Sequence, residues 1–268
     1  MTLHRINRDG TWLHARVDGA TDPGAPTIMF SNSLGTTLEA WDDLLPFLPD
    51  GLRIIRYDMR GHGQSDVPAG PYSMGTLVRD AEAIADELNV KDAMFVGLSV
   101  GGMIGQGLAI KRLDLVRALV LSNTAAKIGT PKLWSERIDM VTSKGMAALA
   151  DGILERWFSK SFRQSPEAMR WRDMLLKISP AGYAGVCSAI AGTDFYTPTS
   201  GLRLPVLGVA GNEDRATPPD LVRETVDLVP GSKFVLMRGV GHIPVAEDAA
   251  GFAAHLNAFL DATGHMAR

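Results

Sequence analysis

The fold is decided by the stretch Ala93-Met94-Phe95-Val96-Gly97-Leu98-Ser99-Val100-Gly101-Gly102. A short apolar run ends in Gly-x-Ser-x-Gly, and a helical pattern follows to about Ile110. A serine at the tip of a tight strand-to-helix turn exposes its hydroxyl, and flanking glycines are needed where a Cβ would clash. The N–H groups that begin the helix also point at developing negative charge. We therefore predict that Ser99 is a nucleophile on such a turn.

Strands and helices alternate on both sides of this turn. Strands are predicted at 12–17, 27–30, 53–57, 93–96, 118–122, 205–210 and 233–237, and helices at 38–48, 74–88 and 249–262. From about Thr124 to Ser200 the sequence looks helical and has no convincing strand. The pattern predicts an α/β fold with a mostly parallel central sheet flanked by helices. Residues 1–123 and 201–268 would form this core, and residues 124–200 an inserted helical cap.

Composition limits the classes of partner. The net charge of −3 does not suggest a nucleic-acid partner or an anionic membrane surface. No stretch approaches the roughly 18 apolar residues that span a bilayer, and no secretion signal is present, so we expect a cytoplasmic protein. The single cysteine, Cys187, excludes an intrachain disulfide, and we interpret it as a small apolar side chain in a helix. Without a metal-binding or nucleotide-binding pattern, we expect no metal and no cofactor.

A serine nucleophile needs a base, and the chain has six histidines. His62 and His242 lie in glycine-rich loops after predicted strands, where parallel sheets collect functional groups. Because the histidine follows the nucleophile in this architecture, we predict His242 as the base. We interpret His62 as a residue that anchors its loop by hydrogen bonds. The remaining four are interpreted as surface residues: His4, His14, His255 and His265.

The acid that orients the base should follow a strand between the nucleophile and His242. Asp214 and Glu213 are both candidates after the run 206–211. We favour Asp214, which lies three residues past Gly211 and far enough around the loop to reach His242. It would hold the imidazole tautomer and stabilise the imidazolium. Asp227, on a predicted helix, is interpreted as a surface residue.

Acyl transfer also needs two N–H donors for the oxyanion. We predict the backbone N–H of Val100, directly after the nucleophile, as one of them. The second would come from the loop Ser31-Asn32-Ser33-Leu34-Gly35-Thr36, and we choose the N–H of Leu34. The alternative for this loop is an ordinary strand-to-helix turn.

These motifs together resemble the α/β-hydrolase superfamily over essentially the full chain. The loop Asp58-x-Arg60-Gly61-His62-Gly63-x-Ser65 is a further hallmark of it. More narrowly, the sequence resembles the 3-oxoadipate enol-lactonases of aromatic catabolism. That resemblance rests on residues 32–36, 97–106, 122–131, 134–138, 154–158 and 210–219, with 123–131 the most specific. The sequence departs from the enol-lactonase pattern at Val100, where such enzymes often carry methionine, and differs mildly from it at residues 242–246.

The resemblance implies hydrolysis of the enol-lactone of 3-oxoadipate through an acyl-enzyme at Ser99, in the β-ketoadipate pathway. A small anionic lactone or ester calls for a cation in the pocket, and our hypothesis is Arg137, beside Trp134. The alternative for Arg137 is a surface arginine on a helix. The alternative enzymes with the same Ser99, Asp214 and His242 are a broader carboxylesterase, a perhydrolase and a carbon–carbon bond hydrolase. A ligand receptor of this fold is the alternative from another class.

Overall fold

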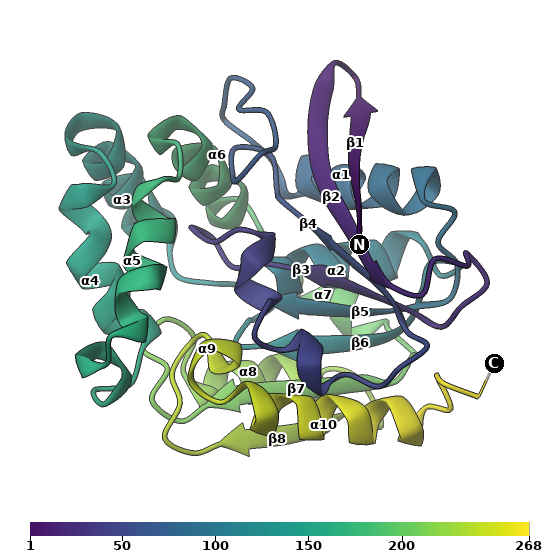
Figure 1. Cartoon of the computed structure of the whole chain (residues 1–268). Helices are drawn as coiled ribbons and strands as arrows, with labels where there is room; N and C mark the ends of the chain where they lie inside the picture. The colour runs from purple at the N-terminus through teal and green to yellow at the C-terminus, as the bar shows by residue number, and fades with distance from the viewer. Residues whose placement is uncertain (268) are drawn as a thin grey trace.

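A computed structural model describes residues 1–267, which form one central sheet covered by helices (Figure 1). Its strands are β1 (Thr2–Arg8), β2 (Thr11–Gly19), β3 (Thr27–Ser31), β4 (Arg53–Tyr57), β5 (Ala93–Leu98), β6 (Val116–Ser122), β7 (Val206–Gly211) and β8 (Lys233–Met237). They lie in the order β1-β2-β4-β3-β5-β6-β7-β8. The pairs β1–β2 and β2–β4 are antiparallel and the others are parallel. The predicted α/β fold with a mostly parallel sheet is therefore confirmed.

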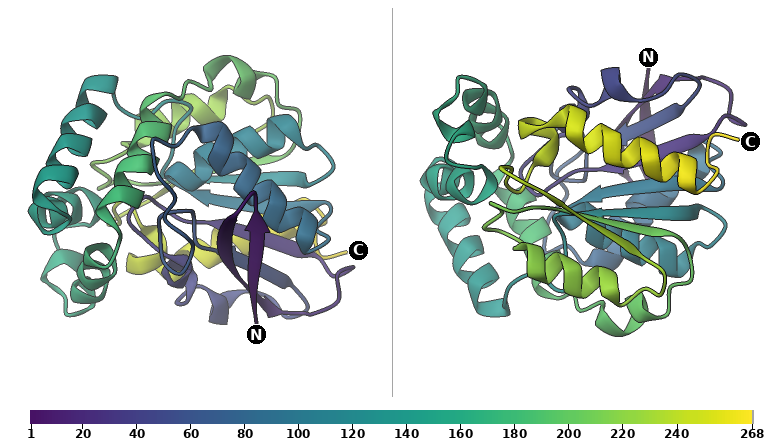
Figure 2. Two further views of the ribbon diagram at one scale, coloured as in Figure 1. Left: turned by 90° about the horizontal axis from the view of Figure 1, so that it is seen from above. Right: turned by 90° about the horizontal axis from the view of Figure 1, so that it is seen from below.

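Helices cover both faces of the sheet. Figure 2 shows α1 (Met74–Glu87) and α2 (Val100–Lys111) on one face and α10 (Ala249–Ala262) on the other. Two shorter helices lie between these elements: α8 (Pro219–Asp227) connects β7 to β8, and α9 (Pro244–Glu247) lies between β8 and α10. The central strands β3, β4 and β5 are buried along their whole length. Burial along a whole strand is typical of a sheet covered on both faces.

The chain between β6 and β7 is helical, as predicted. It contains α3 (Pro131–Lys144), α4 (Ala147–Trp157), η3 (Phe162–Gln164), α5 (Glu167–Leu176), α6 (Pro180–Ala191) and α7 (Tyr196–Ser200). We call α3 to α6 the inserted helices; α3, α4 and α5 stand together at one end of the molecule (Figure 1). In contrast, α7 packs on α2, where the Thr199 hydroxyl donates to Gln106 Oε1 at 2.8 Å. The cap boundaries at 124 and 200 stay a prediction.

Within residues 1–267, no single helix is long and apolar enough to cross a membrane; α5 and α6 meet that test only as a pair, bent by 92°.

Two predictions of secondary structure need correction. The helix predicted at 38–48 is wrong: two short 3₁₀ turns, η1 (Leu38–Trp41) and η2 (Leu45–Phe47), take its place. Pro46 lacks a backbone N–H, and its ring clashes with the preceding turn of an α-helix, so the helix cannot continue. Strand β1 was not predicted. Among its seven residues only Ile6 is buried, so this polar edge strand carries little apolar signal.

The interpretation of His14 and His265 as surface residues is also wrong, since both are buried. The ring of His14 lies on the Asp58 carboxylate, with 2.8 Å between Nδ1 and Oδ2. That of His265 contacts the backbone oxygen of Thr27, at 3.0 Å from Nε2. Each histidine is stabilised inside the fold by a partner distant in sequence, and local polarity does not reveal such a partner.

The turn after β5 holds Ser99 in a strained conformation. Its φ of 59° and ψ of −120° are costly for a residue with a Cβ. The Ser99 N–H donates to the Ser122 carbonyl at 3.0 Å, and the Thr124 hydroxyl donates to the Ser99 carbonyl at 2.5 Å. At Gly101 the first turn of α2 passes so close to β3 that a Cβ would overlap the carbonyl oxygen of Ser31. A side chain there would force the nucleophile turn away from the loop that follows β3.

The loop that follows β3 is fixed by His62. The Gly35 N–H donates to His62 Nε2 at 3.0 Å, and Nδ1–H lies 3.4 Å from the Arg60 carbonyl oxygen. Because Nε2 accepts a hydrogen bond, the ring is neutral, and burial lowers the pKa of His62 to about 4. The interpretation of His62 as a loop anchor is confirmed.

We predict that Gly101→Ala destabilises the protein by about 2 kcal/mol or more, because the added methyl meets backbone that cannot move aside. Gly152→Ala is the matched control. Gly152 is exposed within α4 with open space around its Cα, so alanine there should stabilise by about 0.5–1 kcal/mol through helix propensity. Urea unfolding of both variants measures the difference. Equal effects of the two substitutions would contradict the close approach at Gly101.

His62 also predicts a dependence of stability on pH. The pKa of His62 in the folded state lies below its ordinary value of about 6.5. The neutral ring therefore stabilises the folded state fully above about pH 6.5, and this stabilisation is lost as the pH falls towards 4. His62→Gln removes this titration. The deficit in unfolding free energy of the variant, relative to wild type, should therefore shrink by about 2 kcal/mol between pH 7 and pH 5. A deficit that stays constant over this range in urea titrations would show that His62 is not held neutral.

Candidate active site

One small cavity, of about 70 Å³, brings together residues predicted from distant parts of the chain. Ser99 and His242 reach it from the turns after β5 and β8, and Leu34 from the loop after β3. The inserted helices close it from the other side. Its lining includes Ser33, Leu34, Ser99, Trp134, Arg137, Arg156, Trp157, Tyr183, Thr217 and His242. Functional groups in open α/β sheets collect at the carboxyl ends of the strands, and this cavity lies there.

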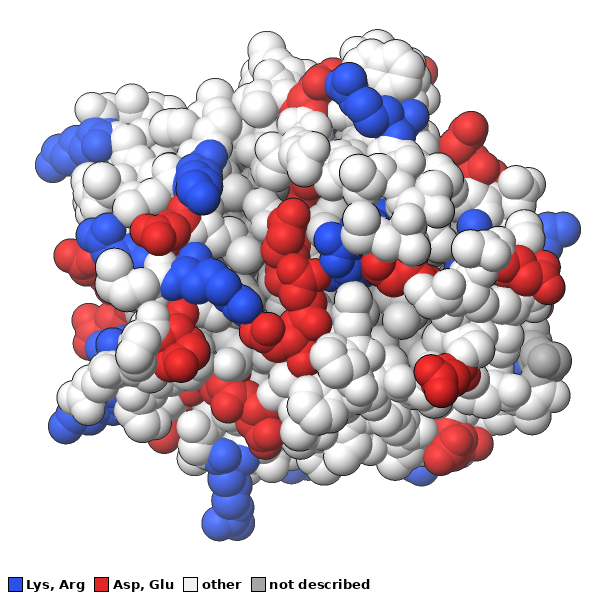
Figure 3. Space-filling view, viewed as in Figure 1, with Lys and Arg blue, Asp and Glu red and all other residues white. Residues whose placement is uncertain are grey.

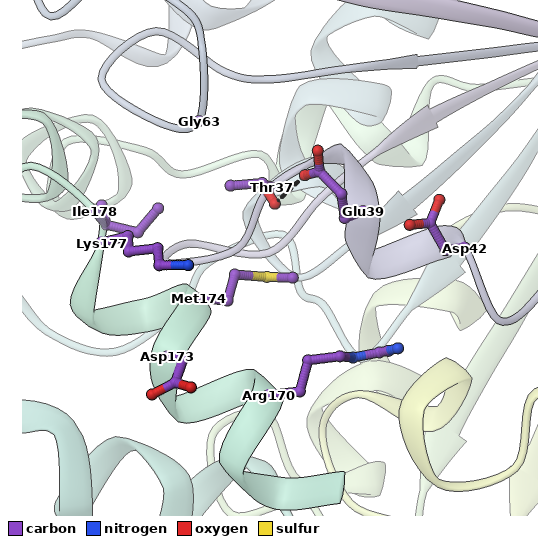
Figure 4. A pocket seen from close by; sticks show the side chains of 9 residues that line it. All are labelled: Thr37, Glu39, Asp42, Gly63, Arg170, Asp173, Met174, Lys177 and Ile178. Atoms are coloured by element: carbon purple, nitrogen blue, oxygen red, sulfur yellow. Dashed lines mark hydrogen bonds between the residues drawn. The ribbon is translucent and has the colours of Figure 1, made fainter. Parts of the chain in front are cut away.

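A larger cavity, of about 760 Å³, lies elsewhere, between η1 and α5. Figure 4 shows Glu39 on η1 and Asp42 directly after it, with Arg170 and Lys177 on the α5 side. Next to it, Arg170 Nη2 pairs with Asp43 Oδ2 at 2.5 Å and joins the inserted helices to the core. On the face in Figure 3, acidic and basic side chains are intermixed. Because none of the predicted catalytic residues lines this larger cavity, we place the candidate site in the smaller one.

Asp214 and His242 form a buried pair. His242 Nδ1 lies 2.8 Å from Asp214 Oδ2, and both side chains are almost completely enclosed. An ionised carboxylate only accepts, so Nδ1 carries the hydrogen and Nε2 presents its lone pair. The other Asp214 oxygen accepts from the N–H groups of Ala216 at 2.7 Å and Thr217 at 3.0 Å. The pair is therefore arranged to hold one imidazole tautomer.

A further residue, Asn123, supports this pair. It follows β6 in the left-handed region, with φ of 46°, and its Nδ2 donates to Asp214 Oδ2 at 2.9 Å and to the Gly241 carbonyl at 3.2 Å. Burial alone raises the pKa of Asp214, but the His242 ring and the bond from Asn123 outweigh it and hold the pKa below its usual value. Asn123 appeared in the sequence only as part of a motif, and its position after β6 was the available signal for this role.

Ser99 is 8% exposed and opens into the cavity that His242 also lines. Within residues 1–267 the structure has no hydrogen bond between the Ser99 hydroxyl and the His242 ring. Catalytic hydrogen bonds of this kind often tighten only when substrate is bound. The two side chains share one cavity, which is the arrangement that a nucleophile and its base need.

Of the two residues predicted to supply N–H donors, Val100 follows Ser99 in the chain and Leu34 lines the same cavity as Ser99. Val100 begins α2, so its N–H belongs to the first turn, where no carbonyl of the same helix is available. Among the described residues, the Leu34 N–H has no acceptor, and Leu34 lines the cavity. Its neighbour Gly35 is the residue held by His62. N–H groups without an acceptor can stabilise an oxyanion that forms within their reach.

The inserted helices contribute aromatic and cationic side chains. Trp134 is buried, and its indole N–H donates to the Ile128 carbonyl at 2.6 Å. The Arg137 guanidinium lies 5.2 Å from the centre of the Trp134 ring and next to the Tyr183 hydroxyl. Arg137 is half-buried and lines the cavity, so it is not an isolated surface arginine. Sequence reasoning did not single out Arg156 and Trp157, which line the same cavity.

The rejected candidates lie away from the cavity lining. Glu213 is exposed, and Asp227 is exposed on α8. Cys187 is fully buried in α6, where burial raises the pKa of its thiol to about 12, as expected for an apolar role. Among residues 1–267, no three His, Cys, Asp or Glu side chains are grouped so as to hold a metal ion.

Known proteins resemble this chain over most of its length. It is 38% identical to 3-oxoadipate enol-lactonase 2 of Acinetobacter baylyi, over 72% of this chain and 73% of that protein. It is 35% identical to 3-oxoadipate enol-lactonase 1 of the same organism, over 80% of this chain and 82% of that protein. The crystal structure of the enol-lactonase from Burkholderia xenovorans LB400 superposes with a TM-score of 0.93 at 36% identity, covering 96% of this chain and all of that one.

The family model described as the alpha/beta hydrolase fold matches residues 26–172, more than half of the chain. That range includes the strained turn at Ser99 and the loop with Leu34. Together with the sheet order and the relatives above, this match shows that the chain belongs to the α/β-hydrolase fold family.

Proposed function

We propose that the protein opens the enol-lactone of 3-oxoadipate to 3-oxoadipate, with Ser99 as nucleophile, His242 as base and Asp214 as the acid that orients the base. The observation that carries this proposal is the small cavity, where Ser99 and the His242–Asp214 pair meet a guanidinium from the inserted helices. The enol-lactonases among the relatives support the choice of substrate. A cavity of about 70 Å³ also favours a small ring over a long acyl chain.

The first half of the proposed reaction forms an acyl-enzyme. Ser99 Oγ attacks the ring carbonyl carbon while His242 Nε2 takes the hydroxyl proton. The N–H groups of Leu34 and Val100 stabilise the oxyanion. The ring C–O bond then breaks, and the leaving oxygen departs as an enol after it receives the proton from His242. The enol tautomerises to the ketone, which makes this step favourable.

The second half releases the product. Water gives a proton to His242 Nε2 and attacks the ester carbon at Ser99. The tetrahedral species collapses, the bond to Ser99 Oγ breaks, and the serine regains its proton from His242. Asp214 stabilises the imidazolium in both halves and does not take the proton itself. The product leaves as a dianion with a second carboxylate.

Substrate recognition in this proposal needs positive charge. The free carboxylate of the lactone enters a half-enclosed cavity, where an unpaired anion would be costly. Arg137 offsets that cost, and its guanidinium is held by the Trp134 ring and the Tyr183 hydroxyl. A role in aromatic catabolism and a cytoplasmic location belong to the same proposal.

We predict that Ser99→Ala lowers kcat on the enol-lactone at least about a thousandfold, because the nucleophile is lost. Ser143→Ala, on the exposed side of α3, is the control and should keep wild-type activity. The loss of enol-lactone absorbance measures both rates. Activity that survives in Ser99→Ala would contradict the mechanism.

The same assay with phenyl acetate tests the alternatives. Wild-type kcat/KM should be much higher for the lactone than for this neutral ester. Comparable values would favour a broader carboxylesterase, and turnover as slow as ligand exchange would favour a receptor.

We predict that Arg137→Ala raises KM for the lactone about 10-fold to 100-fold, with a smaller effect on kcat, because it removes a charge-assisted contact to the substrate carboxylate. Lys132→Ala, on the exposed side of the same helix, is the matched control. Steady-state kinetics measure both variants. An unchanged KM in Arg137→Ala would remove this residue from the binding site.

A further inference from the structure

A second guanidinium lines the cavity, and it comes from a different helix. Arg156, in the last turn of α4, is half-buried and contacts the same space as Ser99 and His242. Within residues 1–267 no carboxylate lies within ion-pair distance of it. The neighbouring Glu155 pairs with Arg163 at 3.8 Å and with Arg215 at 3.3 Å instead. Arg156 therefore brings an uncompensated positive charge to a partly enclosed site, where an anionic ligand would be stabilised.

The backbone around Arg156 is fastened to the loops that carry the acid and the base. The Arg156 carbonyl accepts from the Arg215 N–H at 3.3 Å, next to Asp214. The carbonyl of Trp157 accepts from the N–H of His242 itself, at 2.6 Å. The Glu247 carboxylate adds a further link between the segment after α4 and the His242 loop, since it accepts from Gly241 N–H at 2.8 Å and from Ser159 N–H at 3.2 Å. Arg156 is therefore anchored at the His242 side of the cavity.

Arg137 approaches from elsewhere. It lies on α3, which packs mainly on α6, and its guanidinium lies 5.2 Å from the centre of the Trp134 ring, next to the Tyr183 hydroxyl. The two cations thus reach the cavity from different helices. Arg156 is the one whose backbone is bonded next to the loops that carry Asp214 and His242.

The position of the proton donor fixes where the leaving group must lie. His242 hands its proton to the leaving oxygen, so the leaving group occupies the His242 side of the cavity. In the enol-lactone of 3-oxoadipate, the free carboxylate is attached through one CH₂ group to the carbon that bears this oxygen. The carboxylate therefore extends into the side where Arg156 is anchored.

We infer that Arg156 binds a carboxylate carried by the leaving group, and that the enzyme selects esters and lactones whose anionic group lies on the alcohol side of the scissile bond. This inference rests on the proposed function for the role of His242. A guanidinium binds a carboxylate through two parallel N–H···O contacts, which also orient the substrate. A carboxylate on the acyl side would point away from Arg156 and gain little from it.

Three phenyl esters separate the two sides of the bond. Phenyl acetate is neutral, 4-acetoxybenzoate carries a carboxylate on the leaving group, and phenyl hydrogen succinate carries one on the acyl part. In wild type, kcat/KM relative to phenyl acetate should be higher for 4-acetoxybenzoate than for phenyl hydrogen succinate. Arg156→Gln should lower the ratio for 4-acetoxybenzoate about 10-fold to 100-fold, mainly through KM, and that for phenyl hydrogen succinate less than about threefold.

Three further variants sharpen the test. Arg156→Lys keeps the charge and should retain an intermediate ratio for 4-acetoxybenzoate. Such a result would show that the loss in Arg156→Gln comes from the missing charge and not from misfolding. Arg137→Gln should lower the ratios for both anionic esters. Arg172→Gln, on α5 and paired with Asp151, is the control and should leave both ratios as in wild type.

Two results would overturn the inference: equal effects of Arg156→Gln on the two anionic esters, or a wild type that does not favour 4-acetoxybenzoate. Failure of the proposed function is a separate result. A wild-type protein that hydrolyses these esters but not the enol-lactone would refute the proposed substrate and leave the ester ratios as the test of Arg156.

Discussion

The close approach of α2 to β3 at Gly101 is the constraint on which the site depends. Only a residue without a Cβ lets the start of α2 lie against the Ser31 carbonyl. This contact places the strained Ser99 turn beside the loop that carries Leu34, and His62 fixes that loop from its other side. The geometry of the proposed nucleophile and oxyanion donors is thus set by backbone packing rather than by flexible side chains, which suits a site that must be organised before substrate arrives.

A second constraint joins the base to the inserted helices. The N–H of His242 donates to the Trp157 carbonyl, so the helix that contributes aromatic and cationic groups to the cavity also supports the loop that carries His242. A displacement of α4 would therefore disturb the proposed base and the substrate-binding surface together. The ring of His242 and the hydrogen bond from Asn123 stabilise the buried Asp214 carboxylate and offset its desolvation. Binding specificity and proton transfer share one structural support in this arrangement.

Much of the core could be predicted from local patterns. Apolar runs located the strands other than β1, and the order of Ser99, Asp214 and His242 along the chain matched the loops that the fold brings together. Pro46 shows the limit of such patterns, since the segment 38–48, predicted as one helix, contains this residue without an N–H and forms two short 3₁₀ turns. Arg156 shows what local sequence patterns could not predict about the candidate site. Its importance comes from the loops that α4 touches, and the sequence contains no local sign of those contacts.

The central claim is that Ser99 becomes covalently acylated during turnover. Activated esters transfer their acyl group faster than water removes it, so an acid quench early in the reaction traps the intermediate. Peptide mapping of the quenched protein by mass spectrometry measures where the acyl group lies. If Ser99 is the nucleophile, one acyl group appears on the peptide that contains residues 97–101, together with a burst of about one equivalent of alcohol. An acyl group on another side chain, or turnover with no burst and an unmodified Ser99, would contradict that role.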